Sequence, residues 1–302
     1  MQAMKQTSNQ LTGTLMEKEP LARYTSWRVG GLADRLYKPA SIEDAQRYLR
    51  SLAADEPVFW LGLGSNVLIR DGGLRGSVIY TRGCLKQLND VSLNELYVEV
   101  GVPCAHVAKL AAEKGLADAE FLAGIPGTMG GALAMNAGAF GGETWNLVSR
   151  VIVINRQGEL IERDAASFDV AYRSVSIAKD EWFVACYLTL PTAEDKEGRE
   201  KIRQLLAKRS QSQPTNIPSG GSVFKNPPGD HAARLIEASA LKGRRIGGAQ
   251  VAEKHANFIL NTGNATAKDI ESLIGLVKAT VLEMQGVELQ TEVRIIGEEL
   301  EA

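Results

Sequence analysis

Apolar and polar positions along the chain follow two different periods, and this mixture predicts both strands and helices. Apolar residues at helical spacing after Ser41 predict a helix with Ser41 as its N-cap, and a second helix is expected near 105–114. Residues 151–154 and 159–163 flank an Arg-Gln-Gly turn, which predicts a β-hairpin. Short apolar runs predict further strands at 58–61, 77–80, 96–100 and 182–190.

Two other segments have less regular patterns. Residues 25–38 read as an extended segment that is interrupted by Gly30 and Gly31. Residues 121–142 are rich in glycine, low in charge and follow neither period, so we expect tight turns around something buried rather than a regular element.

The C-terminal part of the chain predicts one long helix and a closing strand. Thr266 and Asp269 form a capping-box pattern at the start of the helix. Residues 289–296 alternate as a strand does, with Glu292 and Arg294 on one face. The apolar positions of the helix share one face: Ile270, Leu273, Ile274, Val277, Val281 and Met284.

A charged stretch at 191–198, rich in helix- and strand-breaking residues, predicts a domain boundary. The order of elements predicts an α+β fold, with one unit that extends to about Leu190 and a smaller unit after it.

Composition argues against several functional classes. The net charge of −2 and the scattered basic residues give no reason to expect nucleic acid as a partner. No apolar run reaches the roughly 18 residues that a bilayer requires, so no membrane is expected. Residues 1–14 are polar and lack the apolar region of a signal peptide, which predicts a cytoplasmic protein. The three cysteines and three histidines lack metal-ligand spacing, and no obligate protein partner is indicated.

The first candidate binding segment is a glycine loop, LGLGSN at 61–66, which directly follows a predicted strand. Backbone N–H groups in such a loop can form an anion-binding nest, and Ser65 and Asn66 add side-chain donors. The loop matches neither a Walker motif nor the Rossmann fingerprint. Alone, it is more typical of an ordinary tight turn.

A second glycine-rich loop, AGIPGTMGG at 123–131, continues to Asn136 and Gly138. Two separate loops of low charge suit a diphosphate held by main-chain N–H groups, and a large planar cofactor would explain glycine backbone in an apolar setting. The alternative is a glycine-rich packing loop.

Together, the two loops resemble the FAD-binding pair of the vanillyl-alcohol-oxidase-type fold. More narrowly, they resemble the UDP-N-acetylenolpyruvoylglucosamine reductases, which use that fold. TSWRVGG at 25–31 resembles the N-terminal strand of this family, and the similarity extends from near residue 20 to about Gly297. The resemblance implies a two-part FAD-binding region at 1–194, with a break near residue 82, and a smaller α+β substrate-binding domain at 195–302.

The resemblance also implies which residues hold the cofactor. FAD is expected to be bound non-covalently, because no histidine or cysteine is placed as in relatives that attach it. The predicted cofactor-binding residues are Gly62, Leu63, Gly64, Ser65, Asn66, Gly124, Gly127, Thr128, Gly130, Asn136 and Gly138.

Three further motifs resemble the catalytic motifs of the family, and they occur in the family's order. These are FDVAYRS at 168–174, GGSVFKNP at 220–227 and EVRIIG at 292–297. They imply Arg173, Ser222 and Glu292 as catalytic residues. Taken singly, each residue is more often structural than catalytic, as a surface ion pair or as turn chemistry.

The resemblance implies that NADPH reduces FAD and that the reduced flavin passes a hydride to the enolpyruvyl ether of UDP-N-acetylglucosamine. In that reaction Arg173 and Glu292 would stabilise the developing charge, and Ser222, helped by a neighbour such as Lys225, would donate a proton. Substrate-binding roles are implied for Arg209, Asn226 and Arg294, although Arg209 is equally readable as a side chain extending into solvent from the end of its helix.

The chain resembles the shorter subclass of the family, which lacks a tyrosine-bearing loop over the substrate. No space for that loop is found between Arg173 and Ser222. Two other functions remain open from the sequence: another FAD-dependent oxidase or dehydrogenase of the same fold, or a flavin- or UDP-sugar-binding protein without turnover. A protein that only binds has no need of a proton donor beside the flavin, which favours the reductase.

Overall fold

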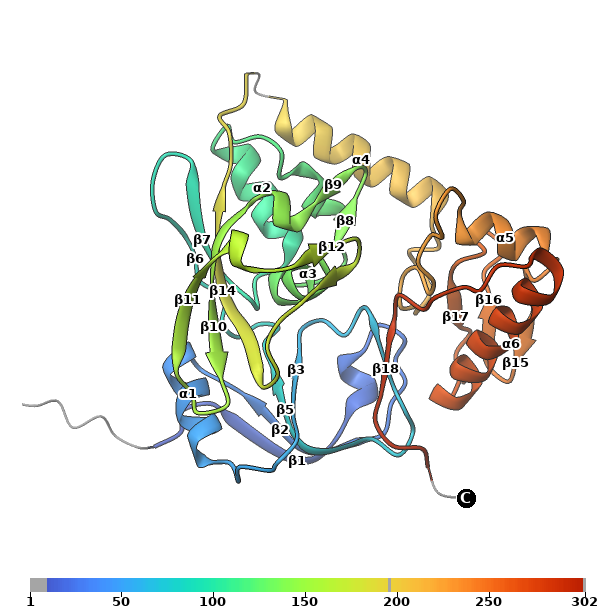
Figure 1. Cartoon of the computed structure of the whole chain (residues 1–302), viewed down its shortest axis with the longest axis horizontal. Helices are drawn as coiled ribbons and strands as arrows, with labels where there is room; N and C mark the ends of the chain where they lie inside the picture. Colours follow the sequence, from blue (N-terminus) through green and yellow to red (C-terminus); the bar gives the residue numbers. More distant parts are fainter. Residues whose placement is uncertain (1–9, 195–196, 301–302) are drawn as a thin grey trace, which may run out of the picture.

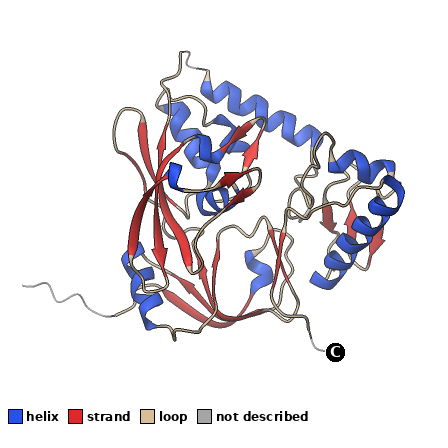
Figure 2. Ribbon diagram, in the orientation of Figure 1, coloured by secondary structure: helices blue, strands red, loops and turns tan. Residues whose placement is uncertain are grey.

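The structure, a computed structural model, describes residues 10–194 and 197–300. An N-terminal sheet and a central sheet lie next to each other, and the C-terminal helices and short strands gather on the other side (Figures 1 and 2). Helix α4 (Gly198–Ser212) runs from the central part of the molecule toward the C-terminal unit. Within the two described ranges, no helix combines the length and the apolar character that crossing a membrane demands.

The N-terminal sheet has the strand order β1-β2-β5-β3. Strand β2 pairs antiparallel with β1 and parallel with β5, and β5 pairs parallel with β3. Helix α1 (Ile42–Ser51) connects β2 to β3, and the Ser41 side chain accepts a hydrogen bond from the Asp44 N–H at 3.2 Å, which confirms the predicted N-cap. The strands are β1 (Thr14–Pro20), β2 (Leu32–Lys38), β3 (Val58–Leu61) and β5 (Leu74–Tyr80).

The central sheet is antiparallel, with the order β11-β10-β14-β7-β6. The hairpin of β10 and β11 confirms the prediction for this part of the chain. Helix α2 (Cys104–Glu113) contributes Val107 to the same buried core as Val98, Val151 and Val184 of the sheet. The strands are β6 (Leu88–Asp90), β7 (Glu95–Glu99), β10 (Val148–Asn155), β11 (Leu160–Asp164) and β14 (Glu181–Thr189).

The C-terminal unit packs two helices, α5 (Ala232–Ala238) and α6 (Ala267–Gln285), against a small antiparallel sheet. The Thr266 side chain accepts from the Asp269 N–H at 3.0 Å, and the Asp269 carboxylate accepts from the Thr266 N–H, so the predicted capping box is present. The sheet consists of β15 (Arg245–Ile246), β16 (Ala249–Val251) and β17 (Ile259–Asn261).

The last strand, β18 (Arg294–Ile296), leaves this unit and pairs in parallel with β4 (Val67–Ile69) of the N-terminal part. This pairing brings the end of the chain beside the first glycine loop. The division of the chain at residue 194 and the break near residue 82 stay predictions.

The glycine-rich segment 121–142 is more regular than predicted. It contains the 3-10 helix η2 (Glu120–Gly124) and the helix α3 (Met129–Met135), so the expectation of tight turns alone was wrong. Met129 and Leu133 of α3 are fully buried, and this tertiary packing stabilises a helix that the local sequence does not favour. Two short strands, β8 (Gly138–Ala139) and β9 (Gly142–Glu143), follow α3.

Two predicted strands are shorter than expected. Of residues 25–38, only β2 is a strand, because residues 25–31 form a loop in which Arg28 has a positive φ of 60° and Trp27 is fully buried. Of residues 289–296, only β18 is a strand, although Leu289 and Val293 are buried. Met284, predicted to share the apolar face of α6, lies in its last turn and is exposed.

Candidate active site

A cavity of about 510 Å³ lies where the first glycine loop, the glycine-rich segment and the C-terminal unit meet. We call it the flavin cavity. All the residues predicted to bind the cofactor line it except Gly130 and Asn136. The cavity is also lined by five residues that were predicted to be catalytic or to bind the substrate: Arg173, Arg209, Ser222, Glu292 and Arg294. The structure therefore brings together residues that lie more than 200 positions apart in the sequence.

The first glycine loop has room only for glycine at two positions. A Cβ atom at Gly62 would lie 2.4 Å from the Thr128 hydroxyl oxygen. Gly64 has a φ of +68°, and a Cβ there would lie 2.1 Å from the Tyr24 carbonyl oxygen. Among the described residues, no acceptor is found for the backbone N–H groups of residues 62–66. The loop thus presents free main-chain donors of the kind that bind a diphosphate.

Thr128 provides an additional donor in the flavin cavity. It is the N-cap of α3, but its side chain makes no capping hydrogen bond. Its Oγ1 atom is buried and has no hydrogen-bond partner within the described residues. A buried hydroxyl without a partner is costly unless a ligand supplies one.

These features fit FAD. Between Trp60 and Phe140, the residues that line the cavity carry no charge. Glycine backbone, the unpaired Thr128 hydroxyl and apolar side chains such as Ala132 and Met135 would hold a diphosphate and a planar ring without cations. When bound, FAD would supply hydride-transfer chemistry at this place.

Arg173 lies in the turn between two short strands, β12 (Val170–Ala171) and β13 (Ser174–Val175), with a positive φ of 55°. Its guanidinium group donates to the Gly138 carbonyl at 2.8 Å and to the Asn136 carbonyl at 3.3 Å. A Cβ atom at Gly138 would lie 2.9 Å from Arg173 Nη1, so glycine leaves space for the guanidinium group.

Glu292 pairs with Arg173, with Oε1 at 3.2 Å from Nε, and both side chains are largely buried. Burial raises the pKa of Glu292, while Arg173 and Lys225 act in the opposite direction. The net direction is upward, so Glu292 holds a proton more readily than an ordinary carboxyl group.

Ser222 and Glu292 are held in one backbone arrangement. The Glu292 N–H donates to the Val223 carbonyl at 2.8 Å, and the Lys225 N–H donates to the Gln290 carbonyl at 2.9 Å. These hydrogen bonds hold the Ser222 loop against the segment that carries Glu292.

Asn257 supports the same loop and was not predicted from the sequence. Its side chain accepts from the Phe224 N–H at 2.9 Å and donates to the Phe224 carbonyl at 2.8 Å. The two residues are 33 positions apart, and no local pattern marks such a contact.

Three predicted ligand residues do not line the flavin cavity. The Gly130 N–H donates to the Val100 carbonyl, and Gly130 packs against Val100, the residue after β7. The buried Asn136 side chain accepts from the Trp145 N–H at 3.1 Å. The Asn226 side chain accepts from the Ala232 N–H at the start of α5. In this structure, these residues hold neighbouring backbone in place.

Arg209 and Arg294 do line the flavin cavity. The Nε atom of Arg209 donates to the Gln213 side chain at 3.0 Å, and burial lowers the pKa of Arg209. Arg209 therefore does not extend into open solvent from its helix. The backbone N–H of Arg294 donates to the Asn66 carbonyl at 3.1 Å, while the Asn66 side chain donates to the Glu292 carbonyl, which ties β18 to the first glycine loop.

Comparisons with known proteins agree with this geometry. The UDP-N-acetylenolpyruvoylglucosamine reductase of Methylococcus capsulatus is 58% identical, over 95% of this chain and 94% of its own length. The reductase of the same name from Legionella pneumophila (strain Paris) is 56% identical over 95% of each chain. The chain belongs to the UDP-N-acetylenolpyruvoylglucosamine reductase family.

Family models and a solved structure support the same assignment. The model of the C-terminal domain of UDP-N-acetylenolpyruvoylglucosamine reductase matches residues 213–296, and an FAD binding domain model matches 33–164. The crystal structure of the Thermus caldophilus reductase superposes with a TM-score of 0.79 at 30% identity, covering 94% of this chain and 98% of that one. This reductase is thus an FAD-dependent oxidoreductase with the predicted α+β fold. Its place in the shorter subclass stays a prediction.

Proposed function

We propose that this reductase uses NADPH to reduce, by way of FAD, UDP-N-acetyl-3-O-(1-carboxyvinyl)-glucosamine to UDP-N-acetylmuramate in peptidoglycan precursor synthesis. The names of its relatives support the substrate. The observation that carries the proposal is the convergence of Arg173, Glu292 and the Ser222 loop on a cavity that fits a flavin. The cavity lining contains no histidine or cysteine among the described residues, which supports non-covalent binding.

When bound, FAD would supply hydride transfer from NADPH to C3 of the enolpyruvyl group. Negative charge then develops at C2 and in the substrate carboxylate. Arg173 is held by the carbonyl groups of Asn136 and Gly138 and by Glu292, and its remaining N–H donors would bind that carboxylate. Such fixed donors stabilise the transition state because they need no reorganisation as the charge forms.

Glu292 in its protonated form would donate a hydrogen bond to the same charge. Its raised pKa favours that form. Ser222 would complete the reaction by giving its proton to C2. Its hydroxyl has no hydrogen-bond partner among the described residues, so the proton is available to a ligand in the cavity. Because serine is a weak acid, a neighbour such as Lys225 must support the transfer.

The phosphate groups of the UDP-sugar would lie near Arg209 and Arg294, the two cations that line the cavity apart from Arg173. Planar guanidinium groups match phosphate oxygens with paired hydrogen bonds. Asn226 stays in this proposal as a substrate-binding residue only if its loop rearranges, since its side chain now caps α5.

The test is the absorption spectrum of the flavin under anaerobic conditions. In the wild type, NADPH should bleach the flavin band, and the enolpyruvyl UDP-sugar should restore it. In Ser222→Ala, bleaching should be unchanged, while reoxidation by the sugar nucleotide should slow about 10³-fold, because general-acid catalysis is lost. Ser210→Ala, an exposed serine on α4, is the matched control and should behave as wild type. An unchanged reoxidation rate in Ser222→Ala would remove the proton-donor assignment.

A further inference from the structure

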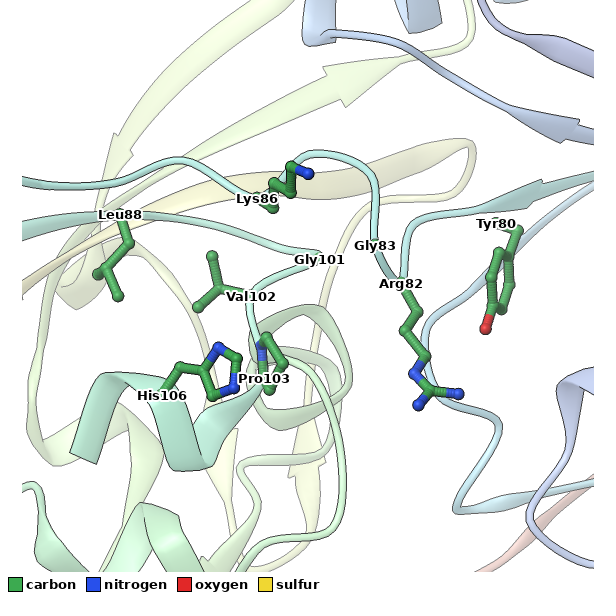
Figure 3. Close-up of a pocket in the computed structure, with 9 residues that line it drawn as sticks. All are labelled: Tyr80, Arg82, Gly83, Lys86, Leu88, Gly101, Val102, Pro103 and His106. Carbon is green, nitrogen blue, oxygen red and sulfur yellow. The ribbon is translucent and has the colours of Figure 1, made fainter. Parts of the chain in front are cut away.

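The flavin cavity is lined by two parts of the molecule, so its shape depends on how they are held together. Lining residues numbered 60 to 173 come from the N-terminal part, and those numbered 209 to 294 come from α4 and the C-terminal unit. A smaller cavity of about 480 Å³, shown in Figure 3, is lined by residues numbered 80 to 106. Movement of the C-terminal unit would therefore change the flavin cavity and leave the smaller one intact.

Asp71, two residues after β4, attaches the N-terminal part to helix α6. Its carboxylate accepts from the N–H groups of Ala267 and Lys268, the first two residues of α6, at 3.0 Å each. A helix leaves its first four N–H groups without partners of its own. The capping box of α6 satisfies two of them, and Asp71 satisfies the other two from 196 positions away.

Arg70, the preceding residue, pairs with the second turn of α6. Its Nε and Nη2 atoms donate to the two carboxylate oxygens of Glu271 at 2.9 and 2.7 Å. Its Nη1 atom donates to the Gly297 carbonyl, just after β18, at 3.3 Å. A bidentate pair fixes direction as well as distance. We call Arg70, Asp71 and Glu271 the clamp.

The clamp continues the segment that carries the first glycine loop. Residues 62–66 lead into β4, and β4 ends one residue before Arg70. Strand β18 pairs with β4, and the Arg70 N–H donates to the Ile296 carbonyl at 2.9 Å. The strand that follows Glu292 is therefore held at the clamp as well.

Helix α6 connects the clamp to the Ser222 loop. The helix belongs to one buried core with Val223 and Phe224, which follow Ser222. Because packed interiors transmit displacement, fixing the start of α6 against β4 also fixes Ser222 against the glycine loop.

A second attachment of the C-terminal unit is buried and does not involve the clamp. Trp27 belongs to the core of that unit, its ring N–H donates to the Ile259 carbonyl, and its own carbonyl accepts from the Asn261 side chain. The clamp is more accessible, since the side chains of Arg70 and Glu271 are 33% and 30% exposed. Ion pairs of this kind add little to stability, so variants of the clamp should fold.

We propose that Arg70 and Asp71 are positioning residues for the step that reoxidises the flavin, because they hold α6, and with it Ser222 and Glu292, over the first glycine loop. This inference rests on the proposed function. A misplacement of about 1 Å caused far from the reacting atoms can slow a reaction about 100-fold. Both residues lie outside the lining of the flavin cavity, so loss of the clamp should slow reoxidation and leave flavin affinity unchanged.

Amide hydrogen exchange of the flavin-loaded protein tests the clamp without turnover. The Arg294 N–H donates to the Asn66 carbonyl across the junction of the two parts. In Arg70→Ala and Asp71→Ala this N–H should exchange about tenfold faster, because the junction opens more readily. The Gly101 N–H, which is hydrogen-bonded beside the cavity of Figure 3, should exchange as in the wild type. Unchanged exchange at Arg294 would overturn the proposal.

Anaerobic reoxidation by the enolpyruvyl UDP-sugar measures the consequence for the reaction. At saturating sugar nucleotide, Arg70→Ala and Asp71→Ala should each slow it about tenfold, with flavin affinity as in the wild type. Asp71→Asn keeps an oxygen acceptor for one of the two N–H groups and should recover part of the rate. Arg163→Ala is the matched control, because it removes an ion pair to Glu181, also 2.7 Å long, inside the central sheet.

The outcomes distinguish positioning from a general loss of stability. Arg163→Ala should reoxidise as the wild type does, and an equal slowing there would overturn the positioning role, as would an unchanged rate in both clamp variants. Arg70→Ala, Glu271→Ala and the double variant should have equal effects, because the pair acts as one unit. If the sugar nucleotide does not reoxidise wild-type flavin, the proposed function fails, and exchange at Arg294 alone decides whether the clamp holds the junction.

Discussion

The two sides of the flavin cavity are built in different ways. From Trp60 to Phe140, the lining is glycine backbone, one unpaired hydroxyl and apolar side chains, with no charged group. The part of the lining that comes later in the chain carries Arg173, Arg209, Glu292 and Arg294, and we call the two parts the uncharged side and the charged side. The first side depends on space and on free main-chain donors, whereas the second depends on charge and on the protonation of one carboxyl group.

The difference predicts two classes of mutational effect. Substitutions on the uncharged side should act through steric exclusion, so they should lower flavin affinity at every pH. Substitutions on the charged side should leave the flavin bound and change the rate and pH dependence of the step that uses the sugar nucleotide. The three changes that follow test this separation, beginning with the largest expected effect.

Glu292→Ala should slow flavin reoxidation by the enolpyruvyl UDP-sugar about 100-fold, the size found when one preorganised donor is lost. Glu292→Gln should slow it less, because the glutamine NH2 group keeps a neutral donor at this position. The proposed role requires Glu292 in its protonated form. Because burial raises its pKa, the protonated fraction persists above the usual carboxyl range and falls as the pH rises through that raised pKa. The wild-type rate should fall with it, and glutamine, which does not titrate, should abolish this dependence.

Stopped-flow reoxidation across the pH range measures both effects, and flavin content provides the control. Glu292→Gln should retain the flavin of the wild type. If the variant loses flavin instead, Glu292 helps to hold the cofactor as the uncharged side does, and the separation of the two sides fails. A wild-type rate that rises with pH through the same range would show that the ionised form is the active one.

Gly64→Ala should lower flavin affinity at least about tenfold, since the added Cβ would lie 2.1 Å from the Tyr24 carbonyl and a left-handed alanine costs about 1–2 kcal/mol. The loss should be the same at every pH. Titration of flavin-free protein with FAD measures it. Gly275→Ala in α6, where a Cβ meets nothing within 4 Å, is the matched control and should bind flavin as the wild type does. A pH-dependent loss in Gly64→Ala would contradict a purely steric role.

The same contrast explains how much was predictable from the sequence. The glycine loops and the motifs of Arg173, Ser222 and Glu292 are local patterns, and the structure places all of them around one cavity. Helix α3 was missed because packing of Met129 and Leu133, rather than propensity, stabilises it.

Contacts between distant parts of the chain could not be predicted from a single sequence. Asn257 fixes the Ser222 loop from 33 positions away. Asn136 stands in a glycine-rich motif and was assigned to the cofactor, yet its side chain bonds Trp145 and its carbonyl group holds Arg173. A motif indicates that a residue matters in such cases, but only the fold determines what it contacts.

Thr128→Val should have the smallest effect of the three changes. It should stabilise the flavin-free protein and weaken the binding of FAD. Without flavin, the buried hydroxyl has no partner among the described residues, so its removal should raise the free energy of unfolding by about 1 kcal/mol. With flavin, a hydrogen bond is lost, and affinity should fall about fivefold. Thermal unfolding of the flavin-free protein measures the change in stability, and FAD titration measures the change in affinity. Thr144→Val removes an equally buried hydroxyl that donates to the Ala137 carbonyl at 2.7 Å, so it should destabilise both forms. If Thr128→Val instead destabilised the flavin-free protein as Thr144→Val does, its hydroxyl would already be satisfied there, and the uncharged side would hold its cofactor by backbone alone.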